Sequence, residues 1–481
     1  MSIRILDVGD EYADFLHDES RREGRADKIA FPASTEEVQE ALAMARQNHW
    51  PVTVQGGRTG ITGGCVPEGG LIINLSKMKA IGPIDGGKMK VQPGASLADI
   101  RSAIEGTGLF FPSDLTETSA TIGGMIANNA SGARSFRYGS VRSWIHALTV
   151  VLPNGEVVQL ERGIHRADGL GFSLGSLSGT LPELEFRSNI KSSAGYYIRP
   201  NMDLVDLFVG AEGTLGIVTE ATLLLLPAMG TVCGLMAFFA DEASALELVQ
   251  FLRDCSRPLA IEWFDAHALD LLRCMKAENE AFADLPALKP VYHTALYFEY
   301  EGEVPSAVGE RVEKAVDCWL GDQASEIETL KRFRHAIPES VNMLIGERKK
   351  TVPELTKLGT DMAVPDGQLE KVMRMYHAGL AEAGLEYVVF GHIGDNHVHV
   401  NILPRSLADY DRGKALYLKW AKEVVSMGGS VSAEHGIGKL KTDFLQLMFG
   451  DAGIQKMRLL KTRLDPSGIL NPGNLFPAHP Q

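Results

Sequence analysis

Hydrophobic and polar positions along the chain alternate between helical and extended spacing, which predicts a fold of mixed helices and strands. Apolar residues recur at helical spacing after Ser34, which forms a capping-box pattern with Glu37, so a helix is expected to begin there. Two β-rich runs follow, at 50–55 and 71–75, with the glycine-rich segment 55–64 between them. This order suggests a backbone that wraps a ligand with its own N–H groups, although a plain glycine-rich hairpin turn is the alternative.

Two more glycine-rich blocks, at 121–133 and 209–218, continue this pattern. Residues 161–190 lie between them and are polar and glycine-rich, which predicts a long surface excursion. After Pro227 the composition changes to Leu-, Ala- and Glu-rich helical patterns that alternate with strands, so we expect a domain boundary near this residue.

The run 387–401 reads as two strands joined by a Gly-Asp-Asn turn. In the second strand His397, His399 and Asn401 alternate with apolar residues, so their side chains share one face. His392 lies across the turn. Chemistry-bearing side chains are therefore expected to cluster at this hairpin.

A carboxylate and a histidine stand side by side at Glu434 and His435, framed by small residues that leave space for a ligand. Two imidazoles and one carboxylate would make a divalent-metal site with open positions, suited to Zn²⁺ and compatible with Mn²⁺ or Fe²⁺. The alternative is that these histidines only form hydrogen bonds inside a core, and the residues alone leave both interpretations open.

Composition narrows the class of protein. The 481 residues are 45% hydrophobic and 22% charged, as in a soluble globular chain, and the net charge of −14 argues against a nucleic-acid partner. The five cysteines form no C-x-x-C pair, which disfavours an iron–sulfur cluster or a disulfide framework and fits a reducing cytosol. No signal peptide or membrane-spanning run is evident, so we expect a cytoplasmic protein.

Generic nucleotide-binding motifs are missing, so phosphate binding by 55–64 would be of another type. The segment 171–175 matches a serine-hydrolase elbow centred on Ser173. That elbow needs a strand before the serine and a helix after it, whereas loop is expected on both sides here, so we interpret the match as coincidence.

Three segments, 55–64, 112–124 and 210–216, resemble the FAD-binding (PCMH-type) domain of the vanillyl-alcohol-oxidase superfamily. Three others, 391–401, 433–438 and 464–473, are similar to the C-terminal domain of FAD-linked oxidases. The resemblance is to the branch of D-lactate dehydrogenases, glycolate oxidase flavin subunits and D-2-hydroxyglutarate dehydrogenases.

The resemblance implies an α+β fold in which two subdomains hold FAD and a ferredoxin-like cap domain is inserted before the chain returns to the flavin. It divides the chain into an FAD-binding domain over 1–227, a cap or substrate domain over 228–420 and a helical C-terminal segment over 421–481. The first glycine-rich loop would hold the FAD pyrophosphate through its backbone amides.

By the same resemblance, the FAD-contacting residues come from the glycine-rich blocks and one C-terminal asparagine. They are Gly56, Gly57, Arg58, Thr59, Gly60, Gly63, Gly64, Pro112, Ser113, Asp114, Thr118, Gly123, Gly124, Asn128, Ser131, Gly132, Gly213, Gly216, Ile217, Val218 and Asn471. Arg58 stands where relatives with covalent flavin have a histidine, so non-covalent FAD is expected.

The family pattern also assigns the chemistry. His392, His399 and Glu434 would be the metal ligands, and His435 the general base that removes the hydroxyl proton of a D-2-hydroxy acid while hydride passes to flavin N5. Arg334 would hold the substrate carboxylate.

Two more positions bear on the substrate. Asn401 matches a substrate-contacting asparagine. Relatives that act on the five-carbon diacid carry a hydroxyl where this chain has Pro338 and a basic residue where it has Gly359; Lys357 could replace the latter only if the loop bends. D-lactate is therefore the expected substrate, with D-2-hydroxyglutarate and glycolate oxidase-type chemistry as alternatives.

Electrons would leave to a separate acceptor, such as an electron-transfer flavoprotein, a quinone or a cytochrome. The resemblance also allows a homodimer and peripheral contact with a membrane. A different class of protein, a non-catalytic electron-transfer flavoprotein subunit, is disfavoured because an electron relay needs neither metal ligands nor a base.

Overall fold

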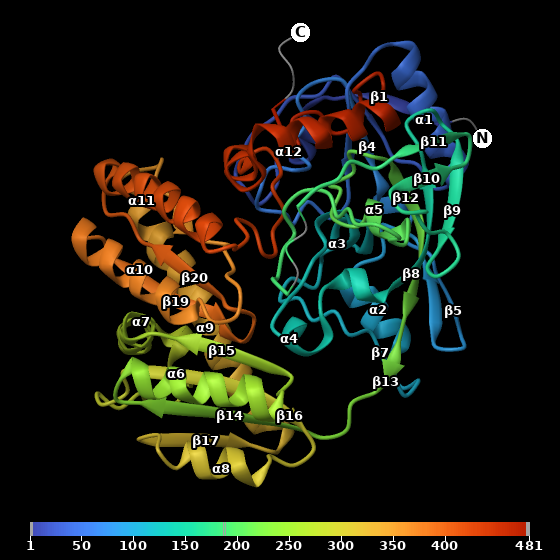
Figure 1. Cartoon of the computed structure of the whole chain (residues 1–481). Coiled ribbons are helices and arrows are strands. Elements are labelled where there is room, and N and C mark those ends of the chain that lie inside the picture. The colour runs from blue at the N-terminus through green and yellow to red at the C-terminus, as the bar shows by residue number, and fades with distance from the viewer. Residues whose placement is uncertain (1–2, 186, 188, 478–481) are drawn as a thin grey trace.

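The structure is a computed structural model that describes residues 3–185, 187 and 189–477. It has two parts that lie side by side: one contains the N-terminal half together with the C-terminal end of the chain, and the other contains the middle of the chain (Figure 1). We call the middle part the cap. A short connection between β13 (Leu226–Pro227) and β14 (Val232–Phe239) leads into it.

The N-terminal part begins with a four-stranded sheet in the order β1-β2-β4-β3. These strands are β1 (Ile5–Asp7), β2 (Lys28–Ala30), β3 (Val52–Gln55) and β4 (Leu71–Asn74). Helix α1 (Thr35–Gln47) packs its apolar face against β2 and β4 in one core cluster. The Ser34 hydroxyl accepts the Glu37 N–H, so the predicted helix start is confirmed.

A second, five-stranded antiparallel sheet has the order β5-β6-β12-β8-β9. Its strands are β5 (Ile81–Asp85), β6 (Lys88–Val91), β8 (Ile145–Val151), β9 (Val157–Glu161) and β12 (Ile217–Leu224). Helices α2 (Leu97–Ile104) and α3 (Ile122–Asn128) share its core cluster. The second glycine-rich block thus includes a helix.

The polar excursion is more regular than the sequence predicts. Within residues 161–190 the chain forms an antiparallel hairpin of β10 (Gly171–Leu174) and β11 (Leu177–Thr180). Buried Phe172 and Leu174 anchor the hairpin on the core, which explains why a glycine-rich stretch becomes a strand. Ser173 lies in β10 and is followed by a strand rather than a helix, so it is not on a hydrolase elbow.

The cap contains a seven-stranded sheet in the order β17-β14-β16-β15-β19-β20-β18. Besides β14, its strands are β15 (Ala260–Phe264), β16 (Thr294–Glu301), β17 (Asp317–Gly321), β18 (Leu358–Gly359), β19 (Tyr387–His392) and β20 (His397–Ile402). Strands β14 to β17, with α6 (Glu242–Phe251) and α8 (Ser306–Val312), follow the β-α-β-β-α-β order of the expected ferredoxin-like unit, except that one further helix, 266–278, is inserted between β15 and β16. Strands β18 to β20 extend it.

Helices cover both faces of the cap sheet. Alternate residues of its strands therefore pack into two different hydrophobic cores, one on each face. On one face lie α7 (Ala266–Glu278) and α9 (Ala324–Lys349). On the other lie α6, α8, α10 (Leu369–Ala383) and α11 (Leu407–Ser426). A polar side chain on a covered face needs a partner, so the polar residues on the face of α7 and α9 are candidates for function.

The chain returns to the N-terminal part through α12 (Thr442–Leu464), which is interrupted at Gly450. The Val52 N–H donates to the Ile469 carbonyl, so the return segment lies against β3 (Figure 1). The boundary expected at residue 420 falls inside α11, and because that helix is continuous we propose to move the boundary beyond Ser426.

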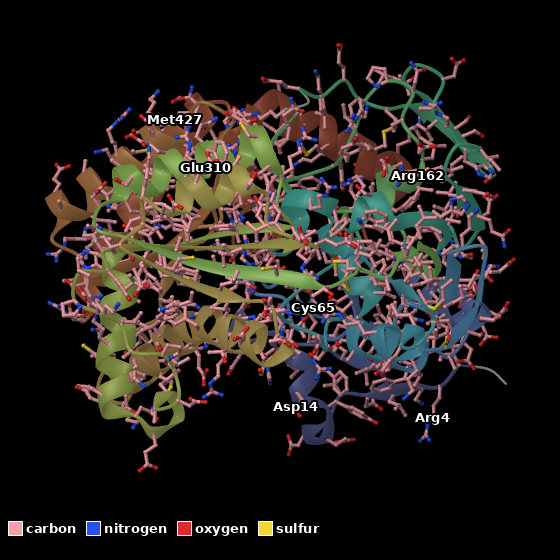
Figure 2. All side chains as sticks on the ribbon, turned by 90° about the horizontal axis from the view of Figure 1, so that it is seen from below. Arg4, Asp14, Cys65, Arg162, Glu310 and Met427 are labelled. Carbon is pink, nitrogen blue, oxygen red and sulfur yellow. The ribbon has the colours of Figure 1, made fainter. Side chains whose placement is uncertain are left out.

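Figure 2 shows the two parts from below: Glu310 and Met427 mark the cap, Arg4 and Arg162 the other part, and Cys65 lies near the boundary. Within the described ranges 3–185, 187 and 189–477, no helix has the length and apolar character needed to cross a membrane.

Candidate active site

The pairing of two cap strands gathers the histidines on one face. β19 and β20 are antiparallel, with His392 opposite His397 and Phe390 opposite His399. The valines between these positions enter the core on the opposite face, so the imidazoles and Asn401 face the side covered by α9. The prediction that His397, His399 and Asn401 share one face of the strand is therefore confirmed.

Two of these imidazoles are held by their Nδ1 atoms. His392 Nδ1 lies 2.6 Å from Glu262 Oε1, and His399 Nδ1 lies 2.9 Å from the Thr360 carbonyl oxygen. Since both partners are acceptors, each Nδ1 carries a hydrogen, and each Nε2 is the ring nitrogen left to meet a metal. The Nε2 atoms face Glu434, at 3.3 Å for His392 and 4.0 Å for His399.

Glu434 is also held from the N-terminal part. Lys191 Nζ lies 2.5 Å from Glu434 Oε1 and 3.3 Å from Asp395 Oδ2, and the Ser131 hydroxyl donates to the same Glu434 oxygen at 3.2 Å. These contacts leave Oε2 as the less occupied carboxylate oxygen. The Lys191 side chain is buried and comes directly after the excursion, where no local sequence signal marked it.

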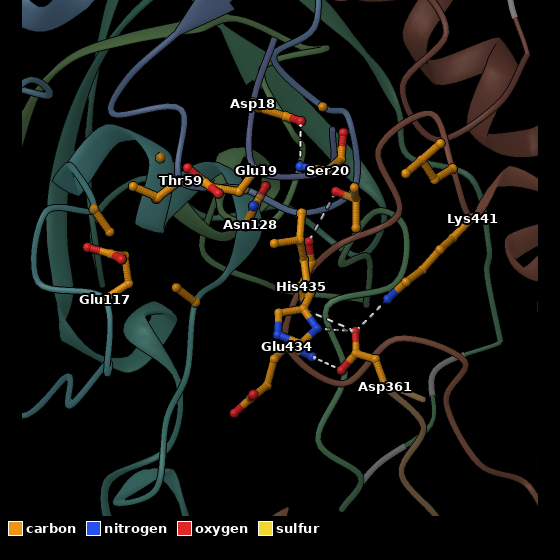
Figure 3. Close-up of a pocket in the computed structure, with 18 of the residues that line it drawn as sticks. Asp18, Glu19, Ser20, Thr59, Glu117, Asn128, Asp361, Glu434, His435 and Lys441 are labelled. Atoms are coloured by element: carbon orange, nitrogen blue, oxygen red, sulfur yellow. Dashed lines mark hydrogen bonds and ion pairs between the residues drawn. The ribbon is translucent and has the colours of Figure 1, made fainter. Parts of the chain in front are cut away.

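Asp361 organises the loop that contains Glu434 and His435. Its carboxylate accepts the N–H groups of residues 433 to 435, the Ser432 hydroxyl at 2.7 Å and the Lys441 ammonium at 2.6 Å. His435 Nδ1 lies 3.2 Å from the same carboxylate (Figure 3). Burial alone would raise the pKa of Asp361, but Lys441 and His435 hold it well below its usual range.

The donor set fits a divalent metal. Ligand atoms of His392, His397, His399 and Glu434 all lie within 4.8 Å of one another. Neither ring nitrogen of His397 makes a hydrogen bond to a described residue, although Nε2 is 3.1 Å from Asp361 Oδ1. Three imidazoles and one carboxylate suit Zn²⁺, with Mn²⁺ or Fe²⁺ as alternatives, so the arrangement is compatible with the predicted ligands and offers His397 as a fourth donor.

The buried histidines and Glu434 shift one another's pKa values. Burial alone would lower the pKa of His392, but the Glu262 and Glu434 carboxylates outweigh it and raise that pKa to about 9. Burial alone would raise the pKa of Glu434, yet His392 and Lys191 hold it well below its usual range. Burial and the other imidazoles lower the pKa of His399. One carboxylate thus remains ionised among the imidazoles.

Arg334 is largely shielded, with 16% of its side chain exposed, rather than a solvated helix charge. Its Nε donates to Glu262 Oε2 at 2.8 Å, and its side chain lines the cavity that also contains His392 and His435. Burial alone would lower the pKa of Arg334, but Glu262 reverses this and raises it. The guanidinium is therefore a fixed cation at the cavity wall, suited to a carboxylate.

The other two predicted substrate residues also line this cavity. Asn401 is buried, and its amide donates to the His399 carbonyl at 3.4 Å. Lys357 bends towards the cavity and donates to Asn342 Oδ1 at 3.0 Å. Burial and then the nearby Arg21 guanidinium lower the pKa of Lys357.

The cavity has a volume of about 1600 Å³ and reaches from these groups to the first glycine-rich loop. Among the described residues, no protein group accepts a backbone N–H from residues 58 to 64. Consecutive free amides that line a cavity form an anion-binding arrangement. This loop therefore fits the pyrophosphate of FAD.

Two glycines allow close backbone contacts around the first glycine-rich loop. A Cβ atom at Gly56 would lie 2.3 Å from Thr121 Oγ1, so a side chain there would push the loop away from α3. Gly438 has φ +53, and its Cβ would lie 2.2 Å from the Thr62 carbonyl oxygen. The second contact brings the loop after His435 directly against the first glycine-rich loop.

Most of the residues predicted to contact FAD line the cavity. Those that do are Gly56, Gly57, Arg58, Thr59, Gly60, Gly64, Gly123, Gly124, Asn128, Ser131, Gly132, Gly213, Gly216, Ile217, Val218 and Asn471. Gly63, Pro112, Ser113, Asp114 and Thr118 do not. The Asp114 side chain instead pairs with Arg101 at 2.9 Å. At this point of the chain the cavity is lined by Leu115, Thr116 and Glu117.

Sequence inspection missed several residues that hold the site. Glu262 lies inside an apolar strand, where an isolated acid is itself a signal, because a buried carboxylate needs partners. Glu212 is also buried and accepts the N–H groups of Ile437 and Gly438. Burial raises the pKa of Glu212 to about 7.

Comparison with known families supports an FAD-binding protein, as the glycine-rich loop and the cavity indicate. Residues 231–475 match the family of FAD linked oxidases, C-terminal domain, and residues 26–161 match an FAD binding domain. The chain belongs to the FAD linked oxidase family.

Relatives and a solved structure agree with this assignment. The chain is 30% identical to a D-lactate dehydrogenase of Anaerostipes hadrus, over 98% of this chain and 94% of that protein. It is also 30% identical to a D-2-hydroxyglutarate dehydrogenase of Stutzerimonas stutzeri, over 94% and 91%. An alkyldihydroxyacetonephosphate synthase shares the fold, with a TM-score of 0.63 at 17% identity over 94% of this chain and 77% of that one.

Acid precipitation should release all FAD into the supernatant. Arg58 occupies the position where a covalent histidine would stand, and its guanidinium lies over the Phe15 ring at 4.4 Å. Flavin absorbance is measured in the supernatant and the pellet. Flavin that stays with the denatured protein would contradict non-covalent binding.

Removal of divalent metal should abolish turnover while the flavin spectrum stays nearly unchanged, because the cluster around Glu434 and the first glycine-rich loop use different residues. The loss should be roughly 100-fold or more, since a Lewis acid contributes several kcal/mol. The measurement is turnover before and after chelation, with Zn²⁺ or Mn²⁺ added back. Full activity in a demonstrably metal-free preparation would disprove the metal assignment.

Proposed function

We propose that this chain is an FAD- and metal-dependent dehydrogenase that oxidises a D-2-hydroxy acid, with D-lactate as the first candidate, to the 2-oxo acid. The observation that carries the proposal is one cavity whose walls hold the free-amide glycine loop, Arg334, the His/His/Glu cluster and His435. A non-catalytic electron carrier would need only the first of these.

FAD bound along 56–64 would supply a hydride acceptor, and a divalent metal held by His392, His399 and Glu434 would supply a Lewis acid for the substrate oxygens. The rest of the work falls to side chains of the protein. Beyond the Nε–H that Glu262 accepts, the Arg334 guanidinium has N–H groups on both terminal nitrogens. One of these nitrogens faces His335 Nε2 at 3.1 Å, and the remaining N–H groups suit the C1 carboxylate. Asn401 adds an amide to the same wall.

His435 is the proposed proton acceptor. Its Nδ1 faces the ionised Asp361, so the hydrogen is assigned to Nδ1 and the free lone pair to Nε2. The side chain is 34% exposed and lines the cavity, so Nε2 is accessible to a substrate hydroxyl. Asp361 stabilises the imidazolium that forms when the proton arrives.

The second half-reaction requires an electron acceptor outside this chain. We propose a separate partner, such as an electron-transfer flavoprotein, a quinone or a cytochrome. The five cysteines are dispersed and free, so an iron–sulfur relay within this chain has no ligand set among the described residues.

A diacid such as D-2-hydroxyglutarate is the second candidate substrate, and Lys357 favours it. Asn342, which accepts from Lys357, lies eight residues beyond Arg334 on α9, about 12 Å along the helix at ~1.5 Å per residue. Among described residues no carboxylate pairs with Lys357 or with the neighbouring Arg21. Two adjacent cations at a cavity wall favour a ligand with a second anionic group.

Anaerobic mixing with the true substrate should bleach the flavin absorbance. If D-lactate is the substrate, kcat/KM for D-lactate exceeds that for D-2-hydroxyglutarate, and Lys357→Met leaves it within about twofold because the C1 carboxylate uses Arg334. A diacid enzyme would show the reverse preference and a much higher KM for the diacid in Lys357→Met. Absence of bleaching by any D-2-hydroxy acid would disprove the proposed function.

Glu434 and His435 are neighbours with different proposed tasks. Glu434→Gln should lose metal together with activity, because a charged ligand is removed. His435→Ala should retain metal and lower the rate of flavin reduction by roughly 10²–10⁴-fold, because only the proton acceptor is lost. Metal content and stopped-flow flavin reduction test both, and a metal-free His435→Ala protein would refute this division of tasks.

A further inference from the structure

The two oxygens of the Glu262 carboxylate serve two different parts of the site. Oε1 accepts from His392 Nδ1 at 2.6 Å, and Oε2 accepts from Arg334 Nε at 2.8 Å. Glu262 is 2% exposed and lies on β15, next to the strand that ends at His392. The same carboxylate therefore touches a proposed metal ligand and the proposed substrate clamp.

We propose that Glu262 is a positioning residue that prepares both partners: it fixes the His392 tautomer whose Nε2 can bind metal, and it sets the direction of the Arg334 guanidinium. This inference rests on the proposed function and adds a residue to which that function assigns no task. Among the described residues, neither His392 Nδ1 nor Arg334 Nε has a second acceptor that could replace Glu262. His392 Nδ1 has this acceptor alone among described residues, and the other contact of Arg334 is His335 at 3.1 Å.

The position of Glu262 explains why the residue is an acid inside an apolar strand. Its neighbours Ile261 and Trp263 enter the core on the face away from α9, so the Glu262 side chain must point towards α9. A carboxylate there without partners would be costly. Arg334 reaches it from α9 and His392 from β19, and together they use both of its oxygens.

A glutamine cannot replace this carboxylate. Its amide has one acceptor oxygen and one NH₂ group. Either Arg334 therefore loses its acceptor, or His392 must accept at Nδ1 and carry its hydrogen on Nε2, where it blocks metal binding. Partners of metal-bound histidines typically change metal affinity or activity by about 10–100-fold when removed. Glu262→Gln should therefore weaken metal binding and, at saturating metal, raise KM for the hydroxy acid.

Glu299 offers a matched control. It lies on the neighbouring strand β16, is buried like Glu262, and pairs with Arg134 at 2.7 Å and with the Tyr297 hydroxyl at 2.5 Å. It makes no hydrogen bond to a residue of the metal cluster among the described contacts. Glu299→Gln therefore removes a buried carboxylate of the same kind and should leave the metal dissociation constant near the wild-type value.

The experiment titrates Zn²⁺ into metal-stripped holoenzyme by calorimetry, without substrate, for the wild type and both variants, with flavin content measured in each. The expected result is a 10–100-fold higher dissociation constant in Glu262→Gln alone. Glu262→Asp keeps the charge on a shorter side chain that cannot reach both partners, so it should show a smaller rise in the same direction and serves if the glutamine variant does not fold.

The outcomes separate this inference from the proposed function. Equal constants in the wild type and Glu262→Gln, or equal losses in Glu262→Gln and Glu299→Gln, would overturn the positioning role and leave the proposed function intact. A wild-type holoenzyme that takes up no Zn²⁺ would instead refute the metal site itself, and the inference with it.

Discussion

The interaction on which the site most depends is the buried carboxylate of Asp361 with the loop that follows Ser430. It receives three consecutive backbone N–H groups, from residues 433 to 435, together with the Lys441 ammonium. This turns the loop so that Glu434 faces the histidines of the cap while His435 faces the cavity. Loss of the carboxylate would leave Lys441, whose side chain is 13% exposed, with the Ser432 hydroxyl at 3.2 Å as its remaining partner, and would release the loop at the same time.

The second constraint is the alternation of side chains in the cap sheet. One parity of β15, β19 and β20 carries the apolar residues that fill a core, and the other carries Glu262, His392 and His399. A shift of one residue in this register would turn the polar set towards the apolar core and the valines towards α9 and the cavity. The same packing that stabilises the cap therefore fixes the spacing of the polar groups, which is why chemistry can be placed on strands rather than on a loop.

Much of this arrangement could be predicted from the sequence, because it depends on local patterns. The helix after Ser34, the two strands around the glycine-rich loop and the hairpin that carries the histidines all follow from spacing and turn residues. The partners that hold the site could not be predicted in this way. Lys191 reaches Glu434 across 243 positions, and only the packing of the segment after the excursion brings the two together. The hairpin of β10 and β11 was missed because two buried side chains outweigh its glycine-rich composition.

The loop from Ser432 to Gly438 also explains why the chain must return to its N-terminal part. Asp361, which precedes the cap hairpin, binds the first half of the loop, and Glu212, from the third glycine-rich block, accepts the N–H groups of Ile437 and Gly438 at 2.7 and 2.8 Å. The Asn471 amide then donates to the Glu212 carbonyl at 2.7 Å. A loop held between one acid of the cap and one acid of the flavin-binding part cannot follow either part alone. The position of His435, the proposed proton acceptor, relative to the first glycine-rich loop is thus set by both parts together, so a change at their boundary would shift this side chain without altering it directly.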